Sequence, residues 1–239
     1  MIITPTSSRP WDSILFDIVG PLEKSVSGNV YMLVVIDVHT HFPEAFPLRS
    51  TESKKIATEL VKLFSRVGIP SRVQSDQAQN FLSTLMQHLF RMLGVKHIKS
   101  SPFHAQSNAL VERLNGTIKK LLKTCLVGKD IRRWDELLPL VLFAIRSSKH
   151  ESTGFSPFEL MYGYEIRGPL DIVRELWAEE DKESPVNLHQ YVMDLRATMR
   201  ELRKQALETE VVAKEEAKVR YDQKAELVEY KEGALPPTP

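Results

Sequence analysis

The stretch "SRVQSD" (residues 71–76) lies between two longer segments that have helical periodicity. Residues 51–68 before it and residues 80–94 after it place apolar side chains at helical spacing. A short β-prone segment between two such helices joins its sheet through crossover connections, which is the arrangement of parallel strands. The stretch therefore predicts an α/β fold and leaves Asp76 at the end of a strand.

Further strands are predicted on both sides of this segment. Residues 11–22, 29–37 and 43–50 follow one another closely and favour an antiparallel meander, and residues 95–100 supply a fifth strand. The predicted order is β-β-β-α-β-α-β followed by helices. We therefore expect a mixed five-stranded sheet that is flanked by helices.

The strongest amphipathic pattern covers residues 108–126. Its apolar stripe has 3-4-4-3 spacing and consists of Val111, Leu114, Ile118, Leu122 and Cys125. We expect this helix to pack its stripe, including Cys125, against the core. A second helix is predicted over 131–149, and a short turn-rich element over 153–163.

Charge is distributed unevenly in a chain whose net charge is only +1. Residues 91–133 carry ten basic and two acidic side chains. Such a block indicates either a site for a polyanion or a solvated basic helix face, and the charge pattern alone favours neither.

Composition excludes several classes of protein. A single cysteine rules out an internal disulfide and a self-contained Cys/His zinc module, so we expect no zinc in this chain and a reducing compartment. No uninterrupted apolar run is long enough to predict a membrane span, and the N-terminus lacks the apolar core of a signal peptide.

Three acidic residues stand out by position. Asp17 lies inside the first predicted strand, Asp76 follows the fourth, and Glu112 lies beside the apolar stripe of the 108–126 helix. If they meet, their oxygens suit a hard cation such as Mg²⁺, and two such ions support phosphoryl displacement. The alternatives are a paired buried acid at Asp17, a turn former at Asp76 and a solvated helix residue at Glu112.

Three motifs make the sequence resemble the integrase core of retroviruses and long-terminal-repeat retrotransposons. They are "FDIVGPL" (16–22), "SDQAQNF" (75–81) and "FHAQSNALVERLNG" (103–116), and 35 residues separate Asp76 from Glu112, as in the family's Asp-35-Glu pattern. "GNVYMLVVIDVHTHFPEAFPL" (28–48) and "TGFSPFELMYGYEIRGPLD" (153–171) resemble the Ty3/Gypsy branch.

This resemblance implies an RNase H-like fold and a metal-binding catalytic triad of Asp17, Asp76 and Glu112. The implied cofactor is Mg²⁺ or Mn²⁺ in a two-metal site. The implied reaction is processing of DNA 3′ ends by water, followed by attack of a 3′-hydroxyl on target DNA. The implied partners are DNA and further copies of the chain, with no membrane, in the nucleus after cytoplasmic synthesis.

The resemblance also implies the residues that contact DNA. Lys119 matches a basic position that touches DNA ends in relatives, and residues 103–108 match the loop that flanks the active site. The full set that we expect at the DNA interface is Lys119, Lys123, Asn108, Asn115, His104 and Gln106.

The sequence departs from the family at three small residues that we expect to modulate the loops. Ala78 and Ala109 stand where relatives usually have Gly, and Ala105 stands where they usually have Pro. Ala78 is harmless if its φ is negative and costly if its φ is positive. Ala109 is expected to extend or stiffen the start of the helix, because Ala favours helix over Gly by about 1 kcal/mol, and thereby to lower strand-transfer activity.

The predicted organisation is a tail at 1–10, a catalytic core at 11–166, a linker at 167–186, a long helical extension at 187–228 and a disordered tail at 229–239. Apolar residues of the extension recur at heptad-like spacing, which favours self-association. Relatives carry flanking domains that are absent from this sequence, so we expect a polyprotein fragment or a truncated genomic copy.

Two functions from different classes remain. The intact carboxylates favour a polynucleotidyl transferase, whereas the altered glycines and missing flanks favour a weak or inactive domesticated descendant that binds DNA or protein. A nuclease for RNA–DNA hybrids would share the fold, but the segments that resemble Ty3/Gypsy elements argue against it.

Overall fold

The structure is a computed structural model that describes residues 9–99 and 109–168, together with single positions between 197 and 219. The strands are β1 (Ser13–Val19), β2 (Tyr31–Asp37), β3 (Pro43–Leu48), β4 (Arg72–Ser75) and β5 (Lys96–Lys99). The helices are α1 (Ser53–Val67), α2 (Gln79–Leu82), α3 (Thr84–Met92), α4 (Ala109–Cys125), α5 (Trp134–Ser147) and α6 (Pro157–Tyr162), and a 3-10 turn, η2, covers Ile131–Arg133.

The five strands form one sheet in the order β3-β2-β1-β4-β5. β1 and β2, and β2 and β3, run antiparallel, whereas β4 is parallel to β1 and β5 is parallel to β4. This confirms the predicted mixed sheet. The crossover through α1 returns the chain next to β1, so β4 ends beside the centre of the sheet rather than at its edge.

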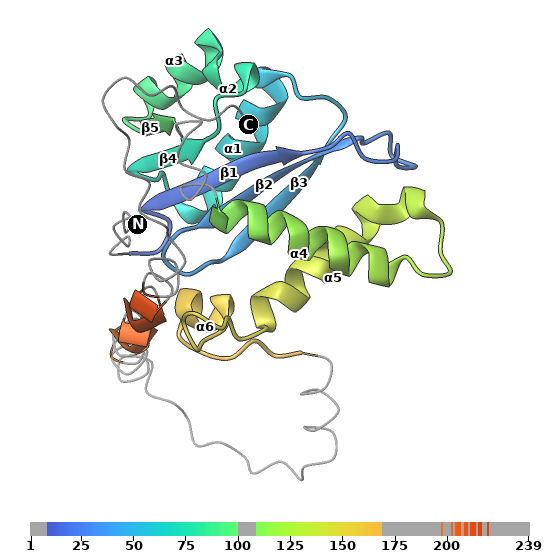
Figure 1. Cartoon of the computed structure of the whole chain (residues 1–239). Coiled ribbons are helices and arrows are strands. Elements are labelled where there is room, and N and C mark those ends of the chain that lie inside the picture. The colour runs from blue at the N-terminus through green and yellow to red at the C-terminus, as the bar shows by residue number, and fades with distance from the viewer. Residues whose placement is uncertain are drawn as a thin grey trace, which may run out of the picture.

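Helices cover both faces of the sheet (Figure 1). Alternate residues of β1 point to opposite faces. Ile14 and Phe16 pack in a cluster with α1 and α3, whereas Leu15 and Val19 pack in a second cluster with α4 and α5. Full burial of one such side chain stabilises the fold by roughly 1.5–3 kcal/mol, so both faces of β1 contribute to stability.

Two predicted helix features are wrong in detail. The helix expected over 80–94 is broken at Ser83, whose extended backbone (ψ 151°) separates α2 from α3 and whose hydroxyl accepts a hydrogen bond from the Met86 amide. The helix expected over 51–68 begins only at Ser53, after Glu52 as its N-cap, which makes no side-chain capping bond. Gly68 ends α1 as expected, at a φ of 93° that disfavours residues with a Cβ.

The predicted stripe of α4 is correct except at its end. Val111, Leu114, Ile118 and Leu122 are buried, but Cys125 is exposed. Cys125 is the last residue of α4, where the chain turns away toward α5, so it lies beyond the part of the stripe that the described core covers. The prediction of a buried Cys125 is therefore wrong.

The C-terminal predictions lie mostly outside the described residues. This holds for the linker at 167–186, most of the extension at 187–228 and the tail at 229–239. Within the described part of the chain, no helix is both long and apolar enough to cross a membrane.

Candidate active site

The parallel pairing of β1 and β4 places two of the predicted carboxylates side by side. Ser13 pairs with Arg72, and Leu15 pairs with Gln74. The same register, continued by two residues, sets Asp17 beside Asp76. Neighbouring strands lie about 4.7–4.9 Å apart, so the two acids occupy adjacent positions at the end of the β1–β4 ladder.

Strand alternation also decides which way Asp17 faces. Leu15 and Val19, two residues on either side of it, both belong to the cluster that packs under α4 and α5. Asp17 therefore points toward α4, the helix that carries Glu112. The register and the alternation together direct the first two carboxylates toward the third.

The carboxylate of Asp17 is held by two hydrogen bonds. Its Oδ1 accepts from the backbone amide of Ile18 at 2.8 Å, and its Oδ2 accepts from Asn115 Nδ2 on α4 at 2.8 Å. Burial raises the pKa of Asp17, and the negative charges of Asp76 and Glu112 raise it further, while the bonds from Ile18 and Asn115 act in the opposite direction. The three acids thus influence one another electrostatically.

Asp76 organises the turn that follows β4. Its Oδ1 accepts a hydrogen bond from the backbone amide of Ala78 at 3.0 Å, which is the pattern of an Asx turn. Ala78 has φ −57° and ψ 139°, and it immediately precedes α2. Because this φ is negative, Ala replaces Gly here without backbone strain, which answers the question that the sequence left open.

The first three turns of α4 carry a polar row. Glu112, Asn115 and Lys119 recur at helical spacing and share one side of the helix. Glu112 is exposed in the first turn, whereas Asn115 is buried. Asn115 Oδ1 is also buried, and it finds no hydrogen-bond partner in the part of the chain that the structure describes. A buried acceptor that is paired with no described residue therefore lies next to Asp17.

Among the described residues, no three or more His, Cys, Asp and Glu side chains lie close enough together to hold a metal ion. Asp17 and Asp76 are adjacent, and Glu112 is near enough to raise the pKa of Asp17 without completing a compact group. The donor chemistry nevertheless fits a hard cation, because it offers carboxylate oxygens and the unsatisfied amide oxygen of Asn115. A bound cation would reduce the repulsion between the carboxylates and would give Asn115 Oδ1 a partner.

Several predicted site residues fall outside the described ranges. These are His104, Ala105, Gln106 and Asn108. Lys119 and Lys123 are described and exposed on α4, and Ala109 is the first residue of that helix. The prediction that Asn115 contacts DNA stays a prediction, and the structure adds that its amide donates to Asp17.

One contact of the site was missed in the sequence. The hydroxyl of Ser75 donates to the backbone carbonyl of Asp76 at 2.9 Å, and His97 Nε2 on β5 lies 2.9 Å from the same hydroxyl oxygen. Since the single hydroxyl proton is used, His97 Nε2 acts as the donor. Burial, and to a lesser extent Lys99, lowers the pKa of His97. Only the β4–β5 register brings this histidine to Ser75, the residue before Asp76, so no local sequence signal marks it.

The sequence of the folded core matches a known domain family. Residues 8–105 match the integrase core domain family, a range that contains Asp17 and Asp76 and ends before Glu112. Together with the sheet and its adjacent acids, this match identifies the segment as an integrase core domain.

Curated relatives extend the similarity beyond that segment. The chain is 32% identical over 173 residues to the Pro-Pol polyprotein of Simian foamy virus type 3 (strain LK3), covering 70% of this chain and 15% of that protein. It is 30% identical over 200 residues to the Gag-Pol polyprotein of Walleye dermal sarcoma virus, covering 80% of this chain and 11% of that protein. The chain therefore spans only a small part of these relatives' length.

Solved structures share the fold. One is the simian T-cell lymphotropic virus intasome in complex with PP2A regulatory subunit B56 gamma, with a TM-score of 0.58, 21% identity and coverage of 74% of this chain and 59% of that chain. Another is the HTLV-2 integrase catalytic core domain in complex with magnesium in a trimeric form, with a TM-score of 0.53, 20% identity and coverage of 63% of this chain and 95% of that chain. The predicted RNase H-like fold with a five-stranded mixed sheet is thus confirmed.

Proposed function

We propose that this protein is a metal-dependent polynucleotidyl transferase that processes DNA 3′ ends and joins them to target DNA. The observation that carries the proposal is the β1–β4 register, which sets Asp17 beside Asp76 on the side of the sheet that faces α4. Glu112 lies close enough to raise the pKa of Asp17. The integrase core match supplies the reaction class.

In this proposal Asp17, Asp76 and Glu112 hold Mg²⁺ or Mn²⁺. When bound, two such ions lower the pKa of the attacking oxygen and stabilise the leaving oxygen of an in-line displacement. The chain's own contribution is to orient the ligands. Asn115 holds one oxygen of Asp17, and the Ala78 amide holds one oxygen of Asp76, so both carboxylates have fixed directions before any cation arrives.

The basic surface of α4 is the proposed path of the DNA backbone. Lys119 and Lys123 are exposed on this helix beyond Glu112, and Lys120 and Arg113 are exposed as well. Neutralising phosphates with such side chains supplies most of the affinity for DNA, independently of sequence. The predicted contacts of His104, Gln106, Asn108 and Asn115 belong to the same proposal.

The proposal extends to the origin of the chain and to its assembly. The segments at 28–48 and 153–171 favour an origin in a Ty3/Gypsy-type element. Self-association is supported by the trimeric form of the HTLV-2 core domain, whose fold this chain shares. An element that integrates into chromosomal DNA implies action in the nucleus.

A DNA end-processing and joining assay tests the proposal. The full chain is incubated with labelled double-stranded DNA ends and Mn²⁺, beside Asp76→Asn and beside Asp12→Asn, which alters an acid just before β1. Product from the wild type and Asp12→Asn that is lost in Asp76→Asn and in EDTA supports catalysis at this site. Product from all three proteins would contradict catalysis at this site. Product from none of them, while DNA binding persists, would also contradict it and would favour the alternative of a binding module without catalytic activity.

A further inference from the structure

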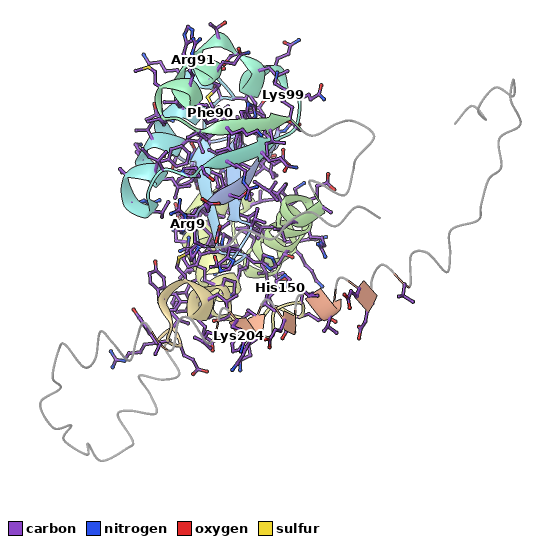
Figure 2. The ribbon with its side chains drawn as sticks, turned by 90° about the vertical axis from the view of Figure 1, so that its left-hand side faces the viewer. Arg9, Phe90, Arg91, Lys99, His150 and Lys204 are labelled. Carbon is purple, nitrogen blue, oxygen red and sulfur yellow. The ribbon has the colours of Figure 1, made fainter. Side chains whose placement is uncertain are left out.

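A cavity lies away from the carboxylates, which do not line it. It has a volume of about 380 Å³, and its walls come from α4, α5, the end of β2 and the segment around His150. Leu114 and Leu121 of α4 and Ile145 of α5 form much of its apolar wall. Figure 2 labels His150 in the lower part of the molecule, well away from Phe90, Arg91 and Lys99 at its upper end. The cavity therefore lies toward the opposite end of the molecule from α3 and β5.

The polar groups that line this cavity are basic or neutral. The basic residues are Arg113, Lys149, His41 and His150, and no Asp or Glu is among the described lining residues. Neither Arg113 nor Lys149 forms an ion pair with another described residue. Arg113 Nε donates to the Ala109 carbonyl at 3.1 Å, which anchors its guanidinium near the start of α4. Positive charge thus borders an apolar space.

The two histidines reach deeper than the other basic residues. His41 is only 6% exposed, and its ring meets that of His150 edge-on, with the ring centroids 4.5 Å apart. A partner that rests on the surface would contact Arg113 and Lys149 but not His41. Only a ligand small enough to enter the cavity can use its whole polar lining.

We propose that this cavity binds a small organic anion with an apolar body, such as an aromatic carboxylate or sulfonate. Its volume falls in the range of about 300–1,000 Å³ that small-molecule sites occupy. The apolar wall takes the hydrophobic body, and Arg113 and Lys149 take the anionic group through charge-assisted hydrogen bonds. The proposal is independent of metal-dependent catalysis, because none of the three catalytic carboxylates lines the cavity.

Two fluorescent probes separate the anionic contribution from the apolar one. The probes are 8-anilinonaphthalene-1-sulfonate and N-phenyl-1-naphthylamine, which share their ring system and differ in the sulfonate. Each is titrated into the full chain and into the Arg113→Gln/Lys149→Gln double variant. We expect a single saturable site, and about a tenfold or larger loss of affinity in the variant for the sulfonate alone. The neutral probe is expected to bind both proteins equally.

Two further variants complete the test. Lys120→Gln removes a charge from α4 at a residue that does not line the cavity, and it is expected to leave both affinities unchanged. Ala144→Trp fills the cavity from α5 and is expected to abolish both, with the fold checked by circular dichroism. An unchanged sulfonate affinity in the double variant, or an equal loss for both probes, would overturn the proposal. So would affinity that falls as protein concentration rises, because a second copy of the chain would then cover the cavity.

Discussion

Asn115 Nδ2 on α4 donates a 2.8 Å hydrogen bond to Asp17 Oδ2 on β1. This contact joins the central strand to the helix that carries Glu112, across 98 residues of sequence. It fixes the direction of one Asp17 oxygen and leaves Asn115 Oδ1 buried without a described partner. The link between the strand and helix halves of the proposed site is therefore a neutral side chain rather than a carboxylate.

Replacing Asn115 with Ala should weaken metal use without unfolding the protein. Loss of a residue that orients a metal-binding carboxylate typically costs about 10–100-fold in metal affinity or activity. We expect the Mg²⁺ concentration for half-maximal DNA joining to rise, and Asn115→Gln, which keeps the amide donor, to restore part of the loss. Thr124→Ala, on an exposed part of the same helix, is the control. A Mg²⁺ dependence identical to that of the wild type would show that Asn115 does not position Asp17.

Asp17→Asn should stabilise the metal-free protein at neutral pH. Because the pKa of Asp17 is raised in the folded state, its ionised form destabilises the fold. This cost is absent below about pH 4, near the unfolded pKa, and grows as the pH rises through the raised folded pKa. In EDTA the variant's advantage in Tm should therefore be absent at about pH 4 and increase as the pH rises.

The same melting curves with Mg²⁺ provide the control for this effect. The cation should stabilise the wild type more than Asp17→Asn, because the variant lacks one ligand. A variant that is less stable than the wild type across the whole pH range in EDTA would mean that burial and the neighbouring acids do not penalise the charge of Asp17.

Ala109→Gly should raise strand-transfer activity, whereas Ala78→Gly should not. Ala109 is the first residue of α4, and Gly there disfavours the helix start by about 1 kcal/mol, which corresponds to at most about a fivefold change in rate. Ala78 has a negative φ, so Gly relieves no strain and only adds flexibility to the unfolded chain. Joining of preprocessed DNA ends measures both. Equal rates for Ala109→Gly and the wild type would contradict the expected effect of the stiffened helix start.

Lys119→Gln should weaken DNA binding uniformly across sequences. One lost phosphate contact changes the slope of log affinity against log salt concentration by about 0.9 for double-stranded DNA. Lys54→Gln, an exposed lysine of α1 on the opposite face of the sheet, should leave the slope unchanged. Fluorescence anisotropy at several salt concentrations measures this. Identical slopes for the two variants would remove Lys119 from the DNA interface.

The strands and helices could be predicted from the sequence because hydrophobic periodicity within each segment is a local signal. Hydrophobic periodicity marked the strand at 71–76 and the helices on either side of it, and the crossover logic predicted that this strand runs parallel to a neighbour. The sequence left open which strand that neighbour is. The adjacency of Asp17 and Asp76 depends on the position of β4 beside β1 and on their parallel register, both of which only the structure supplies.

Hydrophobic periodicity does not contain the information for the remaining features. The break at Ser83 coincides with a local capping bond, and Cys125 is exposed at the end of α4 although it continues the apolar stripe. The bond from Asn115 to Asp17 requires the position of α4 along β1, and the contact of His97 with Ser75 requires the β4–β5 register. Both of these contacts join residues that are distant in the sequence.

The most direct test of the central claim is whether the three carboxylates act as one unit. Single-turnover rates of DNA joining are measured for Asp17→Asn, Asp76→Asn, Glu112→Gln and the Asp76→Asn/Glu112→Gln double variant in Mn²⁺. We predict that each single change lowers the rate by about a thousandfold or more, and that the double variant is no slower than the singles, as for groups that act together. A Glu112→Gln protein that joins DNA at the wild-type rate would contradict the account.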